Sequence, residues 1–204
     1  MICFKKWLIA AAMLLALAGC SGIESYAPAT PAEQQRVDLL HFFNGQSRAW
    51  GMVRDYTGKV VRRFTVDLVG CVRDGQLVLD EHFLYDDGET QFRQWVIDES
   101  SAGHYTGRAA DISGTATGRS EGFALQWQYA MDLPVGDSQY HVRFDDWMYQ
   151  LDNDHLFNQA AIKKWGITVA RVTLFFQRAA DQSVADCQDL SAAPDAGGVA
   201  PHSK

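Results

Sequence analysis

Residues 125–133 read LQWQYAMDL, and two kinds of side chain alternate along them. Odd-numbered positions are apolar or aromatic, whereas even-numbered positions carry glutamine, alanine or aspartate. Successive side chains of a β-strand point to opposite faces, so this period of two predicts a strand with one buried face. Residues 60–68 (VVRRFTVDL) have the same period, with Phe64, Val66 and Leu68 on one face.

Turn signals divide the region from Gln46 to Arg178 into many such strands. They recur every 8 to 17 residues or so, a spacing that suits hairpins. The signals are Thr57-Gly58, Asp74-Gly75, Asp87-Gly88, Ala102-Gly103, Ser113-Gly114, Glu121-Gly122, Gly136-Asp137, Asn153-Asp154 and Trp165-Gly166. Residues 155–164 also fit a short helix, but we favour a strand. About ten strands in a row leave two bare edges unless the sheet closes. We therefore predict an all-β, single antiparallel up-and-down barrel.

A short N-terminal helix precedes the strands. Residues 30–33 (TPAE) place threonine, proline and glutamate where a helix start favours them. Val37, Leu40 and Phe43 then form an apolar stripe, and Asn44-Gly45 ends it. We expect this helix to plug or cover the sheet.

The first twenty residues resemble a bacterial lipoprotein signal that ends in the lipobox LAGC at residues 17–20. Lys5 and Lys6 precede an apolar run that is shorter than the roughly 20 residues needed to cross a bilayer. The alternative is an ordinary secretory signal beside a cysteine. We predict that residues 1–19 are removed and that Cys20 carries acyl chains such as palmitate. Ser21 after it favours the outer membrane of a Gram-negative bacterium, with the protein facing the periplasm.

The composition describes a globular, acidic body. Its formal net charge of −7 becomes two units more negative once Lys5 and Lys6 are removed. Such a body, without a basic stretch, argues against a nucleic-acid partner. Cys71 and Cys187 remain in an oxidising compartment, where they form either a disulfide or two free thiols.

Composition also divides the chain. We expect a lipidated tether at residues 20–30, a helix-plus-barrel domain at 31–180 and a disordered tail at 181–204.

A transmembrane barrel needs an uninterrupted lipid-facing apolar row. The pairs Asp80-Glu81 and Asp145-Asp146 place charges on both faces of their strands, which argues against that architecture.

Several segments recur together in one family. The chain resembles an uncharacterised family of proteobacterial lipoproteins, a domain of unknown function whose members are often encoded near enzymes that modify membrane fatty acids. That association implies a lipid ligand but carries over no catalytic residue. A weaker similarity links Gly45 and Trp50 to calycin or lipocalin-like barrels. The family segments are residues 42–45 (FFNG), 61–64 (VRRF), 85–90 (YDDGET), 114–119 (GTATGR), 144–149 (FDDWMY) and 173–176 (TLFF).

Catalytic and metal motifs are weak. Residues 118–122 (GRSEG) match the Gly-x-Ser-x-Gly motif that surrounds the nucleophile of many hydrolases. The flanking segments, however, predict a β-hairpin and not the strand–turn–helix elbow that this motif requires. The six histidines lack zinc-ligand spacing. The sequence therefore implies no catalytic residue, no metal and no cofactor.

Charged and aromatic residues within the strands are the candidate ligand site. Each can pair on the outer wall or point into a pocket, and aromatic side chains can also simply fill the core. Of Asp145 and Asp146, only one can face inward, because neighbours in a strand face opposite ways. The candidate ligand-binding residues are Arg63, Trp95, Trp127, Tyr129, Arg143, Asp145, Asp146 and Trp147.

These observations predict a lipid-anchored envelope protein whose barrel binds an apolar or amphipathic ligand, such as a fatty acid or lipid-like molecule. Its membrane partner would be reached through Cys20, and a protein partner is unknown. One alternative is a structural or assembly lipoprotein that binds an envelope protein through its outer surface. A third is an enzyme acting on a lipid, which an inward carboxyl of raised pKa beside a second acid or base would favour.

Overall fold

The computed structural model describes residues 22–28, 36–135, 138–180 and 190. The predicted signal segment, Cys20, Cys187 and nearly all of the predicted tail lie outside the described residues.

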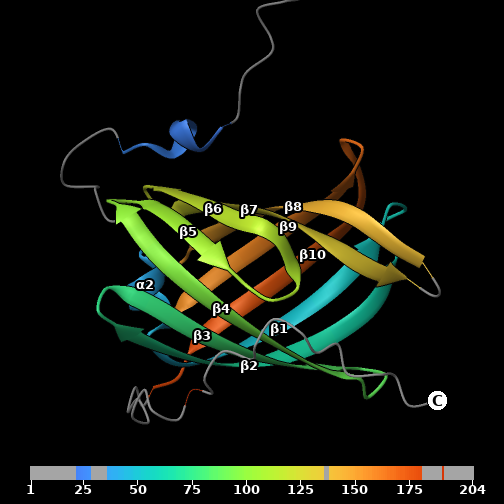
Figure 1. Ribbon diagram of the computed structural model, residues 1–204, viewed down its shortest axis with the longest axis horizontal. Coiled ribbons are helices and arrows are strands. Elements are labelled where there is room, and N and C mark those ends of the chain that lie inside the picture. The colour runs from blue at the N-terminus through green and yellow to red at the C-terminus, as the bar shows by residue number, and fades with distance from the viewer. Residues whose placement is uncertain (1–21, 29–35, 136–137, 181–189, 191–204) are drawn as a thin grey trace, which may run out of the picture.

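Ten antiparallel strands form one closed barrel (Figure 1). Each strand pairs with the next in sequence, and β10 returns to pair with β1, so no edge is left bare. This confirms the predicted all-β up-and-down barrel. The strands are β1 (Gly45–Asp55), β2 (Val60–Arg73), β3 (Gln76–Tyr85), β4 (Thr90–Ser101), β5 (His104–Arg108), β6 (Ile112–Glu121), β7 (Ala124–Val135), β8 (Ser138–Gln150), β9 (His155–Lys164) and β10 (Ile167–Arg178).

Most predicted turns join consecutive strands, but Ser113-Gly114 does not. Both residues lie within β6, and the pairing register with β7 shifts between Ser113 and Thr117. Gly114 has a φ of +79°, which a β-bulge uses as readily as a turn does. The connection from β5 to β6 lies earlier, at residues 109–111. Gly136-Asp137 lies outside the described residues, and 155–164 is a strand, as favoured.

A single-turn helix, α2 (Leu39–Phe43), closes one end of the barrel. The predicted start at Thr30 lies outside the described residues, and residues 36–38 are not helical, so an unbroken helix from there is wrong. The helix begins at Leu39, and Asp38 caps it, because the Asp38 carboxylate accepts a hydrogen bond from the backbone N–H of His41 at 2.9 Å. It ends at Asn44, as predicted.

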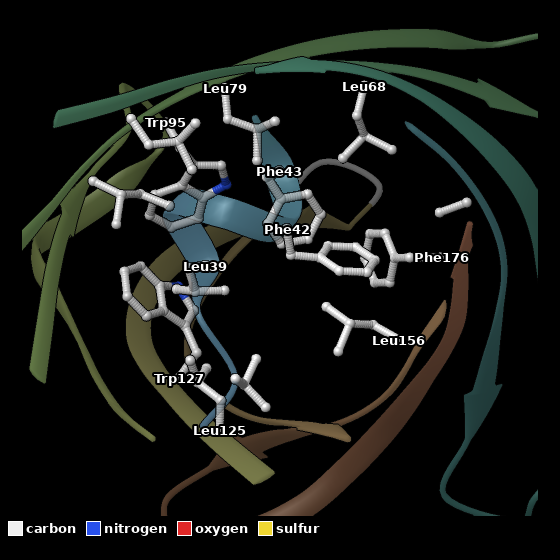
Figure 2. Packing of buried hydrophobic residues seen from close by; sticks show 14 of the residues in the cluster. Leu39, Phe42, Phe43, Leu68, Leu79, Trp95, Leu125, Trp127, Leu156 and Phe176 are labelled. Carbon is white, nitrogen blue, oxygen red and sulfur yellow. The ribbon is translucent and has the colours of Figure 1, made fainter. Parts of the chain in front are cut away.

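The side chains of α2 form the floor of the barrel. Leu39, Phe42 and Phe43 are buried and point among side chains from the surrounding strands (Figure 2). Phe43 meets Phe42 and Phe176 edge to face, with ring centres 5.0 and 5.5 Å away. The strand residues around them in Figure 2 include Leu68, Leu79, Trp95, Leu125, Trp127, Leu156 and Phe176.

The backbone before α2 is also fixed to this end. Val37 donates its N–H to the carbonyl of Gly122, and its own carbonyl accepts from the hydroxyl of Ser120 at 2.8 Å. Gly70 lets the helix approach, because a Cβ there would lie 1.8 Å from the carbonyl oxygen of Phe43. We call this the closed end.

Part of the predicted tether binds the outer wall. Residues Ile23–Tyr26 form a 3-10 turn, η2, against the outside of β6 and β7, toward the end where α2 lies (Figure 1). Tyr26 contacts Phe123 edge to face at 5.4 Å, and Glu24 pairs with Arg119. Ile23 is buried. Residues 23–26 of the predicted tether are therefore held on the barrel wall by these contacts.

Cys71, on the outer face of β2, is disulfide-bonded. Its predicted partner, Cys187, lies outside the described residues, so the Cys71–Cys187 pairing stays a prediction.

Candidate functional site

The barrel is hollow above α2. A cavity of about 530 Å³ extends from Leu39 and Phe43 to the opposite end, where Val61 and Val135 line it and are also exposed. The cavity therefore communicates with solvent at this open end. Its walls are mostly aliphatic and aromatic, and a volume of this size suits a small amphiphilic molecule.

A polar cluster interrupts this apolar wall about midway along the barrel. Arg93 on β4 is directly opposite Glu81 on β3, and its Nη1 lies 4.0 Å from Glu81 Oε2. The other side of the guanidinium binds Asp111, with Nη2 2.6 Å and Nε 2.9 Å from Asp111 Oδ2. The rings of Phe83 and Trp95 each lie 5.8 Å from the guanidinium carbon. Asp111 thus binds the Nε–Nη2 edge of Arg93, while Nη1 faces Glu81 beyond hydrogen-bonding distance.

Glu81 remains only partly charged near neutral pH. Burial raises the pKa of Glu81 to about 7, although Arg93 and a hydrogen bond from Trp95 act in the opposite direction. The repulsion from Asp111 adds to the rise.

Asp146 is the most unusual group in the cavity. Its residue is 8% exposed, and its Oδ1 has no hydrogen-bond partner among the residues that the structure describes. Burial raises the pKa of Asp146 to about 8, assisted by repulsion from Asp145 and Glu81 and opposed by Arg93. Directly across from it on β9 is Ala160, whose small side chain leaves space beside the carboxyl.

Tyr129 and Asn158 complete the polar lining at this level. Tyr129 stacks on Phe144 at 4.7 Å and meets Trp95 edge to face at 5.4 Å. Burial raises the pKa of Tyr129 well above its usual value, and nearby Asp146 adds to this. Asn158 donates to the carbonyl of Trp147 at 3.5 Å. The cluster offers carboxyl, phenol and amide groups inside an otherwise apolar chamber.

The rim of the open end is uneven. Three hairpins, β1–β2, β7–β8 and β9–β10, carry exposed apolar side chains, whereas the β3–β4 hairpin carries Asp86, Asp87 and Glu89. Trp165 is 89% exposed, and the ammonium of Lys164 lies 4.6 Å from its ring. The exposed apolar residues of the β1–β2, β7–β8 and β9–β10 hairpins are Tyr56, Val60, Val61, Val135, Tyr140, Trp165, Ile167 and Val169, and Leu84 and Phe92 are exposed beside the β3–β4 turn.

Four of the eight candidate ligand residues line the cavity. They are Trp95, Trp127, Tyr129 and Asp146. All share the inward parity of their strands, so the structure brings them together around one chamber. Asp146, not Asp145, is the inward member of its pair.

The other four candidates lie on the outer wall. Arg63 pairs with Asp86 at 3.0 Å, and Arg143 is exposed between inward neighbours on β8. Burial acts to raise the pKa of Asp145, but hydrogen bonds from Lys163, Gln126 and Gln128 outweigh it and hold this pKa below its usual value. Trp147 packs beneath η2, with Tyr26 at 5.8 Å. Placement in the cavity is therefore wrong for these four, because each has the outward parity of its strand.

Three members of the central polar cluster were not among those candidates: Glu81, Arg93 and Asn158. Glu81 has the parity of Leu79 and Phe83, and Arg93 has the parity of Trp95. A charge in register with an apolar face was the signal that could have identified both. Asn158 is flanked at two-residue spacing by Leu156 and Ala160 and carries the same signal.

The GRSEG motif has a structural role here. Its Ser120 lies on β6 and holds Val37 at the closed end, away from Asp146 and Glu81 in the cavity. No group of three metal-ligating side chains occurs among the described residues.

The sequence matches a family model over most of its length. Residues 14–178 match the family DUF3833, described as a protein of unknown function. The chain belongs to the DUF3833 family. No curated protein matches this DUF3833 chain. Within the described part of the chain, no helix has the length and apolar character to span a membrane.

Solved structures show that the DUF3833 barrel is calycin-like. One is the S-type phycobiliprotein lyase CPES of Guillardia theta, with a TM-score of 0.52 and 8% identity over 70% of this chain and 91% of that one. Another is Rv2717c of M. tuberculosis, with a TM-score of 0.50 and 13% identity over 69% and 94% of the two chains. At these identities the likeness concerns the fold alone.

Proposed function

We propose that this DUF3833 protein is a lipid-anchored envelope protein that binds an apolar or amphipathic, lipid-like ligand inside its barrel. The observation that carries the proposal is the chamber of about 530 Å³, open at one end and lined mainly by apolar and aromatic side chains. A packed barrel would have favoured the surface-binding alternative. Concave, largely apolar sites with a few convergent polar groups are typical of small-molecule binding.

The anchor rests on the sequence. The LAGC motif at residues 17–20 follows a charged and then apolar segment, and an acylated Cys20 would hold the barrel at a membrane. Replacing Cys20 with Ala should move the protein from the membrane fraction to the soluble fraction with its fold intact. Retention of the Cys20→Ala protein in membranes would contradict the anchor.

Ligand binding can be tested by extracting the purified protein with organic solvent and by native mass spectrometry. We expect a co-purifying lipid-like molecule. Ala160→Phe should displace it by filling the space beside Asp146, whereas Ala161→Phe, on the neighbouring outward position, should leave it bound. If the protein carries no such molecule and takes up none, the surface-binding alternative replaces this proposal.

A second candidate function is acid–base catalysis on the bound molecule. It is favoured by two inward carboxyls, Asp146 and Glu81, whose pKa values are raised to about 8 and about 7. Groups that titrate near neutral pH can exchange protons with a substrate. Turnover of the extracted ligand by the wild type, lost in both Asp146→Asn and Glu81→Gln, would establish it. Unchanged ligand after prolonged incubation would reject it.

A further inference from the structure

The charges inside the cavity do not balance. Two guanidiniums line the cavity, but each is already paired with acids that are not lining residues: Arg62 with Asp87 and Glu89 at the mouth, and Arg93 with Asp111. The carboxyl groups of Glu81 and Asp146 line the cavity in addition, near Arg93. Tyr129 faces the same space and is held in its neutral form. Asp145 lies behind Asp146 on the outer wall and adds only repulsion. The chamber therefore has an excess of acidic groups.

Carboxyl groups already flank Arg93 on two sides, so an anionic head group would meet like charges there. Two of the Arg93 nitrogens donate to Asp111 over 2.6 to 3.1 Å, and a third faces Glu81 at 4.0 Å. A ligand carboxylate would have to displace Asp111 or approach the guanidinium across Glu81. Either route places like charges together in a poorly solvated space, where their repulsion is weakly screened.

Asp146 has a carboxyl oxygen without a hydrogen-bond partner among the described residues. Its Oδ1 is buried, lines the cavity and accepts no hydrogen bond from the described residues. An unsatisfied buried acceptor costs about 1–3 kcal/mol. Ala160 across from it leaves room for a head group to supply the missing donor.

We propose that the chamber selects an amphiphile whose head group donates a hydrogen bond and carries no negative charge, and that this head group binds against Asp146. This inference rests on the proposed ligand-binding function and narrows its lipid-like class. A free fatty acid, the ligand expected from the sequence, is disfavoured because its carboxylate adds to the acidic excess.

The chamber also sets the direction of the bound chain. Asp146 is paired with Trp127 on β7, and toward the closed end the cavity stops at Leu39 and Phe43 of α2. Above Asp146, the inward residues of β7 from Met131 to Val135 are apolar and lead to the open end. From Tyr129 to Val135 the wall extends roughly 15 Å along the barrel axis, given strand rise and tilt. The head group therefore lies deep, and the apolar chain points toward the opening.

Three twelve-carbon amphiphiles test this selection: 1-dodecanol, dodecylammonium and dodecanoate. Their chains are equal, so differences in affinity report the head group. With the purified full-length protein at pH 8, below the critical micelle concentrations, calorimetry should show dodecanol and dodecylammonium binding at least tenfold more tightly than dodecanoate. Ala160→Phe should weaken all three.

Two variants locate the preference. Asp146→Asn should weaken dodecylammonium at least tenfold and narrow its advantage over dodecanoate, whereas Asp145→Asn, on the outer face, should change neither. Glu81→Gln serves as a second test if Asp146→Asn folds poorly. It should raise the affinity for dodecanoate relative to that for dodecylammonium. Dodecanoate binding as tightly as dodecanol overturns the head-group inference and leaves ligand binding standing. Binding of none of the three, with no effect of Ala160→Phe, overturns the proposed function itself.

Discussion

The closed and open ends of the barrel are made by the same ten strands but have opposite packing. At the closed end, α2 fills the interior with Leu39, Phe42 and Phe43, and Ser120 fixes the backbone of Val37. At the open end, the interior is empty and apolar side chains such as Trp165 face solvent.

The closed end stabilises the fold, whereas the middle and the open end leave space for a ligand. Packing at one end stabilises a fold whose middle is left hollow, and the buried acids between the ends lower stability at neutral pH because their charges are poorly solvated. Stability should therefore respond strongly to changes at the closed end and weakly to changes at the rim.

The largest expected effect is that of Phe43→Ala. Removing this ring, which is 4% exposed, leaves a void against Phe42 and Phe176 and should lower the free energy of unfolding by about 3–5 kcal/mol. Urea denaturation followed by tryptophan fluorescence measures it. A loss below about 1 kcal/mol would mean that α2 does not act as a stabilising plug.

Next is the disulfide of Cys71, one residue after the Gly70 that touches α2. Cys71→Ser should lower the free energy of unfolding by about 2–4 kcal/mol, because the open chain gains conformational entropy when unfolded. Peptide mapping without reductant should identify Cys187 as the partner. A different partner would make the predicted pairing wrong.

The buried carboxyls give a pH signature. The pKa of Asp146 is about 8 in the fold, above its ordinary value of 3.8, so the folded protein holds a proton that the unfolded chain releases. Stability should fall as pH rises from about 4 to 8, with Glu81, at a pKa of about 7, contributing in the same direction. Asp146→Asn cannot ionise, so it should be more stable than the wild type at pH 8 by several kcal/mol and should lose less stability between pH 4 and 8, as urea denaturation at each pH would measure.

Asp145→Asn is the matched control for this pH effect. The pKa of Asp145 is lowered in the fold, so its charge stabilises the protein above the unfolded pKa and this contribution is lost on acidification. The variant should therefore be less stable than the wild type at pH 8, opposite in sign to Asp146→Asn. Equal signs for the two neighbours would refute their assignment to opposite faces.

The smallest expected effect is at the rim. Trp165→Ala removes a side chain that is 89% exposed and should change the free energy of unfolding by no more than about 0.5 kcal/mol. Chemical denaturation alongside Phe43→Ala compares the two ends directly. A loss at Trp165 similar to that at Phe43 would remove the distinction between them.

Strand alternation was enough to predict the closed barrel, because a period of two and regular turns are local properties. It also placed Trp127, Tyr129 and one member of the Asp145-Asp146 pair on the inward face. Where a strand carries charged or aromatic residues on both faces, alternation alone does not show which face is inward, because that depends on the neighbouring strands. Arg63 and Trp147 were therefore selected as cavity residues although they face outward, and Glu81 was not selected although it faces inward. Whether an inward aromatic fills the centre or lines a void depends on packing across the barrel, which periodicity does not encode.

The segment before α2 was harder to predict. Residues 30–33 have good local signals for a helix start, yet α2 begins only at Leu39, where Asp38 caps it. Likewise, the composition of residues 22–28 describes a linker, while the positions of Ile23 and Tyr26 against β6 and β7 depend on tertiary contacts.

The docking of η2 determines which way the barrel would face. Gly22 leads into η2, which lies on the β6–β7 flank, and only Ser21 separates Gly22 from Cys20 in the sequence. With Cys20 acylated as proposed, the bilayer would lie along this flank near the closed end. The opening, at the other end of the barrel from α2, would then not face into the bilayer, so cargo would be exchanged through the aqueous compartment and not directly with the lipids beneath.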